Sequence, residues 1–548
     1  MYFCGMKHYL EKFESMVKAC WTKPVYINYG GEEFSYGEVA ADIEKFHILF
    51  EASGVKKGDK IAICARNNAR WAVVFWSGVT YEAVVVPILA EFTPDAVMNL
   101  VHHSGSTVLF TDADIWAKLD PSKMPDLKAA ITLADFTVIY NPDGSMSGCH
   151  KVLFKLFEEK FPSGFSDADV AYPHDNGKDL AVINYTSGTT SVPKGVMLRH
   201  ECFSDTVEFS QTNLRVEQGE KVVSMLPLAH MYGLVIEMIY PTCSGCSITF
   251  LGKTPSPTLL LKAMKDVRPY MVVAVPLVLE KIYKSSLKPA LHKLRGVTWI
   301  PILNSIIYKK VGRRLVESFG GNVRIFIMGG APLNPEAEKC FRRINIPYTV
   351  GYGMTEAAPL LAYEDPDKYV PGSCGKACHE VRIDSEDPQT IAGEIQARGA
   401  NICSGYFNNP EANAIAFTDD GWLRTGDLGI IDSKGNIFIK GRSKSMILSA
   451  NGQNIYPEEV EAVLNSQPYV AESVVVDRAS KIVALVYLDA TAIRNAGLDA
   501  EAVSDIPETV RVSSNKVLPA YSQITKVEVV LEPFAKTPKM SIKRFLYK

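Results

Sequence analysis

The chain has 548 residues, and at about 150 residues per domain this length predicts three or four folding units rather than one core. Its 47% hydrophobic and 22% charged residues are ordinary for a globular protein. The formal net charge of -3 argues against a uniformly basic nucleic-acid-binding surface, so we expect no nucleic-acid partner. The eleven cysteines are scattered, which predicts free thiols in a reducing compartment and a cytoplasmic protein.

The N-terminal segment has no long apolar run and no cleavage signature, so we expect an amphipathic helix and not a signal peptide. The most apolar stretch, Trp71–Leu89, contains Ser77 and Glu82. A membrane-spanning helix needs about 20 apolar residues with few charges. We therefore predict a buried helix followed by the strand Ala83–Ile88, and no transmembrane segment.

Short runs rich in β-branched residues alternate with longer helical patterns such as Ser35–Glu51. The strand-like runs are Lys60–Ala65, Val84–Ile88, Thr107–Thr111 and Leu180–Tyr185. This alternation predicts an α/β architecture with mainly parallel sheets. Pro142–Ser147 and Pro162–Gly177 are expected to be loops. Cys243 and Cys246 are interpreted as a turn before a buried strand, Ser247–Leu251, and not as a metal site.

The composition changes near Lys440–Ser445, after a stretch dense in glycine and aspartate. About a hundred residues follow with strand and helix patterns of their own. The expected strands are Glu472–Asp477, Ile482–Leu488 and Thr525–Val530. We therefore predict an N-terminal domain of residues 1–443 and a small C-terminal domain of residues 444–548.

The most informative segment is Tyr185–Gly195, where a strand leads into small hydroxylated residues and glycines and ends on Pro-Lys-Gly. Such a loop presents backbone N–H groups and hydroxyls to an anion, and Lys194 adds a positive charge. It is not a Walker A loop, because G-x-x-x-x-G-K-[ST] is absent. The sequence therefore predicts a phosphate-binding loop.

This loop resembles [ST]-S-G-[ST]-T-G-x-P-K-G of the adenylate-forming (AMP-binding) superfamily, with Ser191 in place of a glycine. Further motifs of that superfamily follow in the family's order, and the resemblance extends from about Asn28 to Arg544. They are Leu226–Gly233, Gly329–Leu333, Gly351–Glu356, Gly421–Asp427, Gly441–Lys444 and Asn451–Glu459. The resemblance implies a large N-terminal domain of α/β subdomains with mainly parallel sheets and a β-barrel-like part. It also implies a small α+β C-terminal domain on a hinge.

The resemblance assigns roles to individual residues. Catalytic roles fall on Thr186, Lys194 and Glu356, and Glu356 is also the expected ligand of Mg²⁺, a hard cation that prefers oxygen. Tyr352 is expected to stack on adenine, and Asp427 and Arg442 to hold the ribose. The expected acyl-binding residues are His230, Met231 and Tyr232. The remaining cofactor-binding residues are Ser187, Gly188, Thr189, Thr190, Gly330, Ala331, Pro332, Gly351, Gly353, Thr355, Lys444 and Gly452.

The implied reaction activates a carboxylic acid with ATP as an acyl-adenylate, then forms a thioester with coenzyme A. Amino-acid-activating relatives place a carboxylate near the position of His230, and Ala229–Tyr232 contains none. An apolar acid is therefore favoured over an amino acid. Val275–Tyr283 and the residues after Gly54 resemble segments of long-chain fatty acyl-CoA synthetases, which favours a medium- or long-chain fatty acid as the substrate. Open alternatives are an acyl carrier protein as acceptor, a luciferase-like oxygenation, and a weakly active or non-catalytic ligand-binding relative.

The C-terminal motif departs from the family pattern P-K-T-x-x-G-K-[IL]-x-R. Aligned on Lys536, the position of the family's adenylation lysine carries Ser541. Lys539 and Lys543 lie two residues to either side, and residues two apart in an extended segment share a face. We therefore expect Lys543 or Lys539 to substitute for the missing lysine. The alternative is that both are solvated and adenylation is slow.

Residues 281–314 contain nine lysines and arginines, no acidic residue, and interleaved apolar side chains. This pattern favours peripheral contact with an anionic bilayer on the inner membrane surface. A solvated basic face over buried apolar residues is the slightly favoured alternative.

Overall fold

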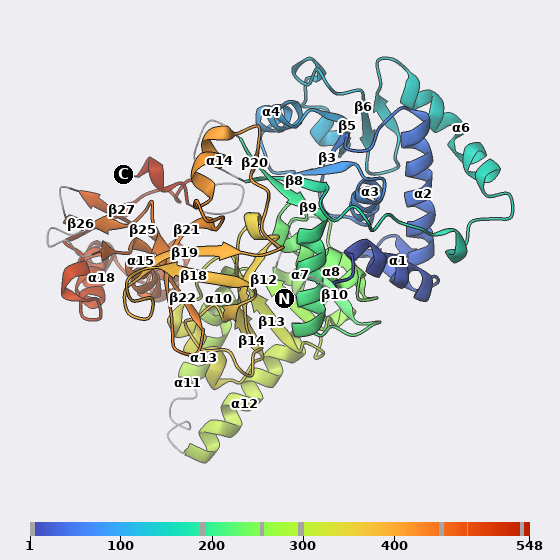
Figure 1. The fold of residues 1–548 in the computed structure, drawn as a ribbon. Helices are drawn as coiled ribbons and strands as arrows, with labels where there is room; N and C mark the ends of the chain where they lie inside the picture. Colours follow the sequence, from blue (N-terminus) through green and yellow to red (C-terminus); the bar gives the residue numbers. More distant parts are fainter. Residues whose placement is uncertain are drawn as a thin grey trace.

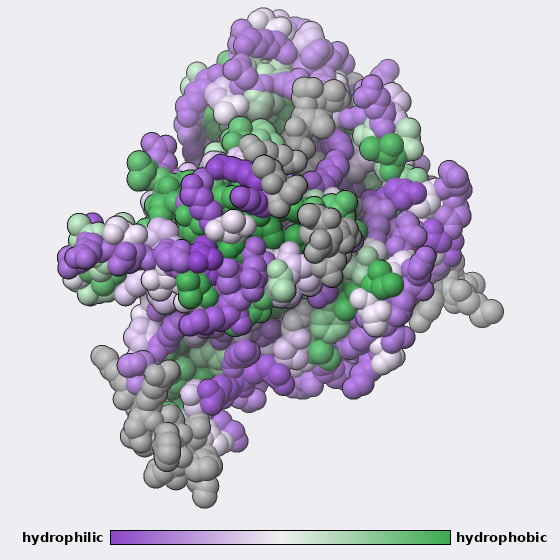
Figure 2. Space-filling view, turned by 90° about the vertical axis from the view of Figure 1, so that its left-hand side faces the viewer, coloured by the Kyte–Doolittle hydropathy of each residue, from purple (hydrophilic) through white to green (hydrophobic). Residues whose placement is uncertain are grey.

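The computed structural model describes residues 6–186, 193–252, 257–293, 301–448, 454–478, 481–536 and 542–547. In Figure 1 the chain forms a large body, and its last hundred residues form a separate unit on one side. Figure 2 turns that side to the viewer and shows a mostly hydrophilic face with apolar side chains gathered near its middle. The described helices include none that is both long enough and apolar enough to cross a membrane.

An eight-stranded sheet with order β20-β9-β8-β4-β3-β5-β6-β7 forms one half of the large body. Its central strands β8, β4, β3, β5 and β6 pair in parallel, and its edges are antiparallel. The strands are β3 (Lys60–Cys64), β4 (Val84–Ile88), β5 (Ser106–Thr111), β6 (Ala129–Thr132), β7 (Val138–Tyr140), β8 (Leu180–Thr186), β9 (Lys194–Arg199) and β20 (Tyr406–Phe407).

The helices around this sheet follow from local sequence signals. Helix α2 (Tyr36–Ala52) begins at a capping box in which Ser35 and Glu38 satisfy each other's backbone N–H groups. Helix α3 (Ala69–Thr80) is buried along nearly its whole length, which confirms a core helix in the most apolar stretch. The others are α4 (Pro94–Ser104), α5 (Ala113–Trp116), η1 (Pro121–Lys123), α6 (Ser145–Lys160) and η2 (Asp167–Asp169).

The loop expected at Pro142–Ser147 is wrong in its second half, because helix α6 begins at Ser145. Gly144 adopts the left-handed region at φ 73°, and Asp143 accepts hydrogen bonds from the backbone and hydroxyl of Ser145. Asp143 therefore orders the first turn of a helix whose polar start is typical of a loop.

A seven-stranded sheet with order β14-β13-β12-β10-β11-β1-β2 forms the other half, parallel except at the β1–β2 edge. Its strands are β1 (Pro24–Asn28), β2 (Glu33–Ser35), β10 (Lys221–Ser224), β11 (Ser247–Phe250), β12 (Met271–Ala274), β13 (Ile325–Met328) and β14 (Tyr348–Val350). One apolar cluster runs from this sheet to the first and includes Tyr26, Phe75, Ile61 and Phe250. The two sheets therefore share a core.

Helices cover the second sheet, and Figure 1 shows the long helix α12 projecting from the body. They are α1 (Tyr9–Ala19), α7 (His200–Asn213), the π-helix η3 (Gly233–Ile239), α8 (Tyr240–Thr242), α9 (Pro257–Val267), α10 (Pro276–Ile282), the π-helix η4 (Tyr283–Leu287), α11 (Lys288–Lys293), α12 (Pro301–Ser318) and α13 (Pro335–Arg343). The turn at Cys243 leads directly into β11, as expected.

Two small antiparallel sheets pack around a common core and correspond to the barrel-like part. One contains β15 (Tyr352–Gly353), β16 (Leu360–Tyr363) and β17 (Lys376–Ala377). The other contains β18 (Glu380–Asp384), β19 (Gly393–Arg398), β21 (Leu423–Ile431) and β22 (Ile437–Arg442), with η5 (Thr355–Ala357) and α14 (Pro410–Ala416) nearby in sequence.

The C-terminal unit is an α+β structure with its own apolar core around Leu464, Ala484 and Val510. Its strands are β23 (Ile447–Leu448), β24 (Asn454–Ile455), β25 (Val470–Arg478), β26 (Lys481–Leu488) and β27 (Lys526–Val530). Its helices are α15 (Pro457–Ser466), α16 (Ala490–Ala496), α17 (Ala500–Ser504), α18 (Ile506–Asn515), η6 (Ala520–Ser522) and η7 (Arg544–Leu546). The mixed α/β architecture expected from the sequence is thus confirmed.

Candidate active site

The predicted motifs meet where parallel strands end. Strands β10, β13 and β14 run in the same direction through the second sheet, so their carboxyl ends share one edge. The segments after them are Leu226–Gly233, Gly329–Leu333 and Gly351–Glu356. Open α/β sheets bind ligands at the carboxyl ends of their strands. The sheet thus brings together the segments expected to bind the acyl group and adenine.

Asp427 on β21 lies opposite Arg442 on β22 in the register of the two strands. The Arg442 Nε atom is 3.0 Å from the Asp427 Oδ1 atom. The Tyr352 hydroxyl donates a hydrogen bond to Asp427 Oδ2 at 2.7 Å. All three residues assigned to the nucleoside by sequence therefore lie together, although they come from two different sheets.

Asp427 is only 4% exposed, while the Arg442 side chain is largely exposed. Burial raises the pKa of the Asp427 carboxyl, and the charge of Arg442 and the hydroxyl of Tyr352 partly oppose this rise. Burial also raises the pKa of Tyr352, and the negative charge of Asp427 adds to the effect. A buried carboxylate with one hydrogen-bond donor and one cation is suited to accept hydrogen bonds from two ribose hydroxyls.

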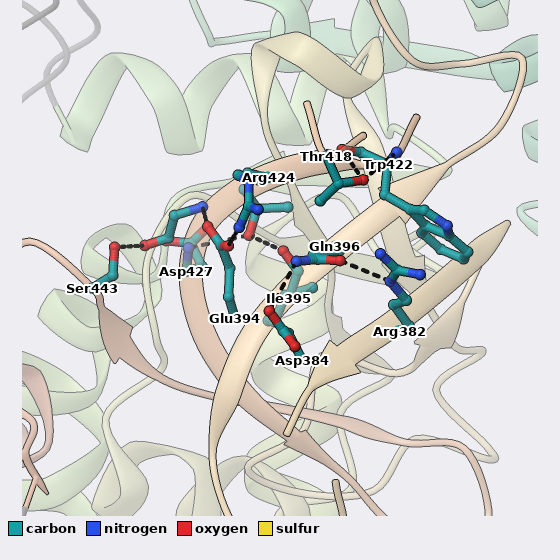
Figure 3. A network of polar contacts seen from close by, with 12 residues as sticks. Arg382, Asp384, Glu394, Ile395, Gln396, Thr418, Trp422, Arg424, Asp427 and Ser443 are labelled. Atoms are coloured by element: carbon teal, nitrogen blue, oxygen red, sulfur yellow. Dashed lines mark hydrogen bonds and ion pairs between the residues drawn. The ribbon is translucent and has the colours of Figure 1, made fainter. Parts of the chain in front are cut away.

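A polar network holds the strand on which Asp427 lies (Figure 3). Glu394 accepts hydrogen bonds from the Gly426 amide at 3.2 Å and from Arg424 at 3.0 Å. The Ser443 hydroxyl donates to the Gly426 carbonyl at 3.2 Å. These contacts fix the backbone at Gly426, where the pairing of β19 with β21 is irregular just before Asp427, and join it to the start of the segment that leads to the C-terminal unit.

Glu356 lies in η5 and is 8% exposed. The Tyr406 hydroxyl donates a hydrogen bond to Glu356 Oε1 at 2.8 Å, and the Lys194 Nζ atom lies 5.2 Å from the centre of the Tyr406 ring. Thr186 pairs with Lys194 across β8 and β9. Three of the residues with predicted catalytic roles are therefore neighbours, with Tyr406 between Glu356 and Lys194.

The donor set around Glu356 is compatible with magnesium. The Tyr406 hydroxyl engages Oε1, and Oε2 makes no hydrogen bond or ion pair within the described residues. The described part of the chain contains no cluster of three or more metal-ligating side chains. Mg²⁺ commonly binds through one or two carboxylates together with substrate phosphates and water, so a single carboxylate fits this mode.

The glycine-rich segments border this site. Gly330 has a φ of 82° and open space where a Cβ would lie, and Ala331 and Pro332 are exposed. Gly351 donates its amide hydrogen to the Met328 carbonyl at 2.8 Å, which ties the ends of β13 and β14 together. Gly353 and Thr355 lie between Gly351 and Glu356, in the segment that follows β14.

The segment Leu226–Tyr232 follows β10 and turns back into the π-helix η3. Met231 is 2% exposed, and the Tyr232 hydroxyl donates to the Ile327 carbonyl on β13 at 3.1 Å. The Asn184 amide group on β8 donates to the Ala229 carbonyl at 2.8 Å. The strand that leads into the loop expected to bind phosphate therefore contacts the segment expected to bind the acyl group, in which His230 lies half-buried.

Two described residues with predicted roles, Lys444 and Lys543, belong to the C-terminal unit. Lys444 is exposed in the turn after β22. Lys543 donates its backbone amide hydrogen to the Ala535 carbonyl at 2.8 Å. No contact within the described residues joins Lys543 to Glu356, Lys194 or Asp427. The arrangement therefore shows no contact between Lys543 and the residues expected to bind the nucleotide.

Among the described residues, few polar side-chain contacts join the C-terminal unit to the large body. Lys440 on β22 pairs with Glu459 on α15 at 3.0 Å. Lys284 donates to the Asn465 carbonyl at 3.2 Å. Exposed polar pairs contribute little to stability.

Several residues with predicted roles lie outside the described part of the chain. They are Ser187, Gly188, Thr189, Thr190, Gly452, Lys539 and Ser541.

The sequence did not predict Tyr406 or Asn184, nor Asn67 and Glu237, which hydrogen-bond the backbone of Leu226. Tyr406 and Asn184 lie on strands and carry no motif of their own, so only the sheet pairing reveals them. Glu237 could have been recognised from the sequence as a buried polar residue, because it is the only charged residue within the apolar run Leu234–Tyr240.

Comparison with known proteins defines the class. Residues 13–407 match the family described as AMP-binding enzyme, and residues 444–547 match its C-terminal domain. The chain belongs to the AMP-binding enzyme family, and its relatives place it among the adenylate-forming acid–thiol ligases.

The relatives act on different acids. The chain is 26% identical to the long-chain-fatty-acid–CoA ligase FadD15 of Mycobacterium bovis, over 97% of this chain and 91% of the relative. It is 28% identical to 4-coumarate–CoA ligase 3 of Oryza sativa subsp. japonica, over 81% and 76% of the two chains. The o-succinylbenzoate CoA synthetase of Bacillus subtilis, in complex with its acyl-adenylate, has the same fold with a TM-score of 0.76 at 22% identity, over 98% and 97% of the two chains.

Proposed function

We propose that the protein activates a medium- or long-chain fatty acid as its acyl-adenylate and transfers the acyl group to coenzyme A. The observation that carries this proposal is the composition of the segment at the carboxyl end of β10. Its side chains between Leu226 and Tyr232 include no carboxylate that could pair with a substrate amine. Glu237, the acid that follows on η3, instead accepts hydrogen bonds from the strand end. A substrate acid with an uncharged acyl chain is therefore favoured.

The first step forms a mixed anhydride. An oxygen of the fatty carboxylate attacks the α-phosphorus of ATP, the bond between the α- and β-phosphates breaks, and pyrophosphate leaves. In the proposal Asp427 and Arg442 hold the ribose while Thr186 and Lys194 bind phosphate oxygens. Positioned donors and cations are worth most where charge develops on the phosphates. Glu356 would hold Mg²⁺, which would neutralise negative charge on the phosphates and orient them.

The second step exchanges one leaving group for another. The thiol sulfur of coenzyme A attacks the acyl carbonyl, the bond between that carbon and the phosphate oxygen breaks, and AMP leaves. The thiol loses its proton in this step. We propose that the unit from residue 444 onward rotates about Lys444 between the steps. In this rotation Lys543 or Lys539 reaches the phosphates during adenylation, and the segment with Gly452 faces the site during thioester formation.

A substrate panel tests the proposal. Pyrophosphate release is measured with acids from acetate to oleate, and the acceptors coenzyme A and acyl carrier protein are compared in one assay. Release that rises with chain length and thioester formed with coenzyme A support the proposal. Pyrophosphate release with an aromatic acid such as 4-coumarate, and none with any fatty acid, overturns the acid assignment. Absence of release with every acid supports a non-catalytic ligand-binding relative.

We also propose peripheral contact with an anionic bilayer through residues 281–314. Lys309, Lys310, Arg313 and Arg314 are exposed on the projecting helix α12, and Ile306 is 58% exposed. Helix α12 is anchored to the body near its C-terminal end, where Leu315 is buried. A cationic helix with apolar side chains is attracted to anionic lipid.

Vesicle flotation at low salt tests this contact. Vesicles containing phosphatidylserine should carry the protein upward, and vesicles of neutral lipid should not. Reversal of Lys309 and Lys310 to glutamate should abolish flotation, whereas the same reversal at Lys151 and Lys155 on α6 should not. No flotation of the wild type identifies a solvated basic face instead.

A further inference from the structure

The carboxyl group of Glu237 lies directly beneath the acyl-binding segment and is fully buried. Its Oε2 atom accepts three hydrogen bonds at 3.0 Å, from the Ser224 hydroxyl and from the backbone amides of Met225 and Leu226. Ser224 is the last residue of β10, and Leu226 begins the segment that continues to Tyr232. A single side chain therefore fixes the backbone where the strand passes into that segment.

Other side chains hold the same segment from further elements. The Asn67 amide group donates to the Leu226 carbonyl at 2.7 Å and accepts from the Leu228 amide at 2.9 Å. Asn67 follows β3, a strand of the other sheet. Leu226 thus has its N–H bound to Glu237 and its carbonyl bound to Asn67.

The backbone brings Glu237 to this position by a close return. A Cβ at Gly233 would lie 2.7 Å from the Pro227 carbonyl oxygen, so η3 begins in direct contact with the segment. From there the π-helix places Glu237 beneath Ser224 and Leu226. π-Helices are rare in proteins and are frequently found at functional sites.

We propose that Glu237 is a positioning residue that sets the geometry of the acyl-binding segment Leu226–Tyr232. The proposal rests on the function proposed above and names how the pocket for the acid is held. Glu237 acts through the backbone of Leu226 and not on the substrate itself. Loss of its hydrogen bonds should displace the segment and weaken binding of the acid, while the ribose-binding residues on β21 and β22 keep their places.

The charge state of Glu237 is consistent with a structural hydrogen-bonding role. Burial raises the pKa of its carboxyl to about 8, against the opposing effect of its three hydrogen bonds. The second oxygen, Oε1, is buried and has no hydrogen-bond partner within the described residues. The titratable group facing it is Tyr232, whose own pKa is raised first by burial and then by Glu237. Burial therefore favours the neutral form of the carboxyl, and glutamine is the closest mimic of that form.

The experiment compares Michaelis constants in pyrophosphate release with the best acid of the substrate panel, so the test does not depend on the chain length. Glu237→Ala should raise KM for the acid about tenfold, the effect of losing about 1.4 kcal/mol of positioning hydrogen bonds. KM for ATP should stay within about twofold. Glu237→Gln should restore most of the acid affinity, because its side-chain oxygen can accept the same amide hydrogens.

Thr242→Val is the matched control. Thr242 is fully buried on α8, the helix that continues η3, and it hydrogen-bonds the Tyr26 hydroxyl at 2.9 Å and the Met238 carbonyl at 2.7 Å. Its loss should lower stability without changing KM for the acid. Asn67→Ala removes the second support of Leu226 and should reproduce the rise in KM for the acid.

An unchanged KM for the acid in Glu237→Ala overturns the proposal. So does an equal rise in both Michaelis constants, or the same rise in Thr242→Val, because each indicates general loss of structure. If Glu237→Ala does not fold, Asn67→Ala decides the outcome by the same criteria, and Glu237→Gln should then keep a KM for the acid close to that of the wild type. Failure of the proposed function is seen separately, as wild-type protein that releases no pyrophosphate with any fatty acid.

Discussion

Tyr352 and Asp427 form a buried pair in which the tyrosine hydroxyl donates to the carboxylate at 2.7 Å. The two residues lie 75 positions apart and belong to different sheets. Tyr352 is 7% exposed, so its ring can offer only part of one face to a base. The pair joins the segment expected to bind adenine to the residue expected to bind ribose.

Asp427→Ala should weaken use of ATP severely. It removes the acceptor of two ribose hydroxyls, and hydrogen bonds to a charged group contribute about 1.5–3 kcal/mol each. KM for ATP should rise more than tenfold in pyrophosphate release. An unchanged KM for ATP with unchanged turnover would count against the assignment.

Tyr352→Phe should have a smaller effect on the same measurement. It keeps the ring and removes the donor to Asp427, so we expect a rise in KM for ATP of about three- to tenfold. Tyr363→Phe is the matched control, since it removes a tyrosine hydroxyl that contacts Asp365 outside the site. An equal effect of both variants would show that the hydroxyl of Tyr352 has no special role.

Glu356→Gln should lower turnover and change its dependence on magnesium. The variant keeps the shape and the contact with Tyr406, but it loses the charge expected to bind the cation. We expect the Mg²⁺ concentration for half-maximal pyrophosphate release to rise by about tenfold or more. Tyr406→Phe should leave that concentration closer to the wild-type value. Titrations that do not distinguish Glu356→Gln from the wild type would exclude Glu356 as the ligand.

Glu237 should make folding stability depend on pH. Its pKa is raised to about 8 in the folded protein, whereas an exposed glutamate has a pKa of about 4.3. Between these values the folded state binds more protons, so stability falls as pH rises and levels off above about pH 8. The limiting slope for one proton is about 1.4 kcal/mol per pH unit. Urea unfolding from pH 5 to 8 should show this loss in the wild type relative to Glu237→Gln, and parallel curves would contradict the raised pKa.

Lys543 and Lys539 should act in adenylation and not in thioester formation. Each is changed singly to alanine, and the two half-reactions are measured separately. If one of them replaces the missing lysine, its loss should slow adenylation by about 10²–10³, as for removal of one oxyanion donor. Equal adenylation rates in both variants would show that neither substitutes. Strong acceleration by Ser541→Lys would then identify a weakened adenylating enzyme.

The sequence predicted the parallel sheets well, because runs such as Lys60–Ala65 and Val84–Ile88 are short, β-branched and separated by clear helical patterns. It also predicted which residues meet at Asp427, because the family resemblance names them. The start of α6 was missed, because the hydrogen bonds of Asp143 to Ser145 give a helix start the composition of a loop.

The supporting residues were harder to predict. Tyr406 reaches Glu356 only because β20 pairs with β9, and Asn67 reaches Leu226 across two sheets. These contacts join residues 50 and 159 positions apart. No local pattern encodes pairs of such separation, since each residue alone is ordinary for a strand end or loop.

ATP-dependent pyrophosphate release with oleate, decanoate, acetate and 4-coumarate in parallel, without a thiol acceptor, tests the proposed activation of a fatty acid most directly. We predict release with decanoate or oleate, formation of the corresponding acyl-adenylate, and little release with acetate or 4-coumarate. Release with 4-coumarate alone, or no release with any of the four acids, would contradict the proposed function.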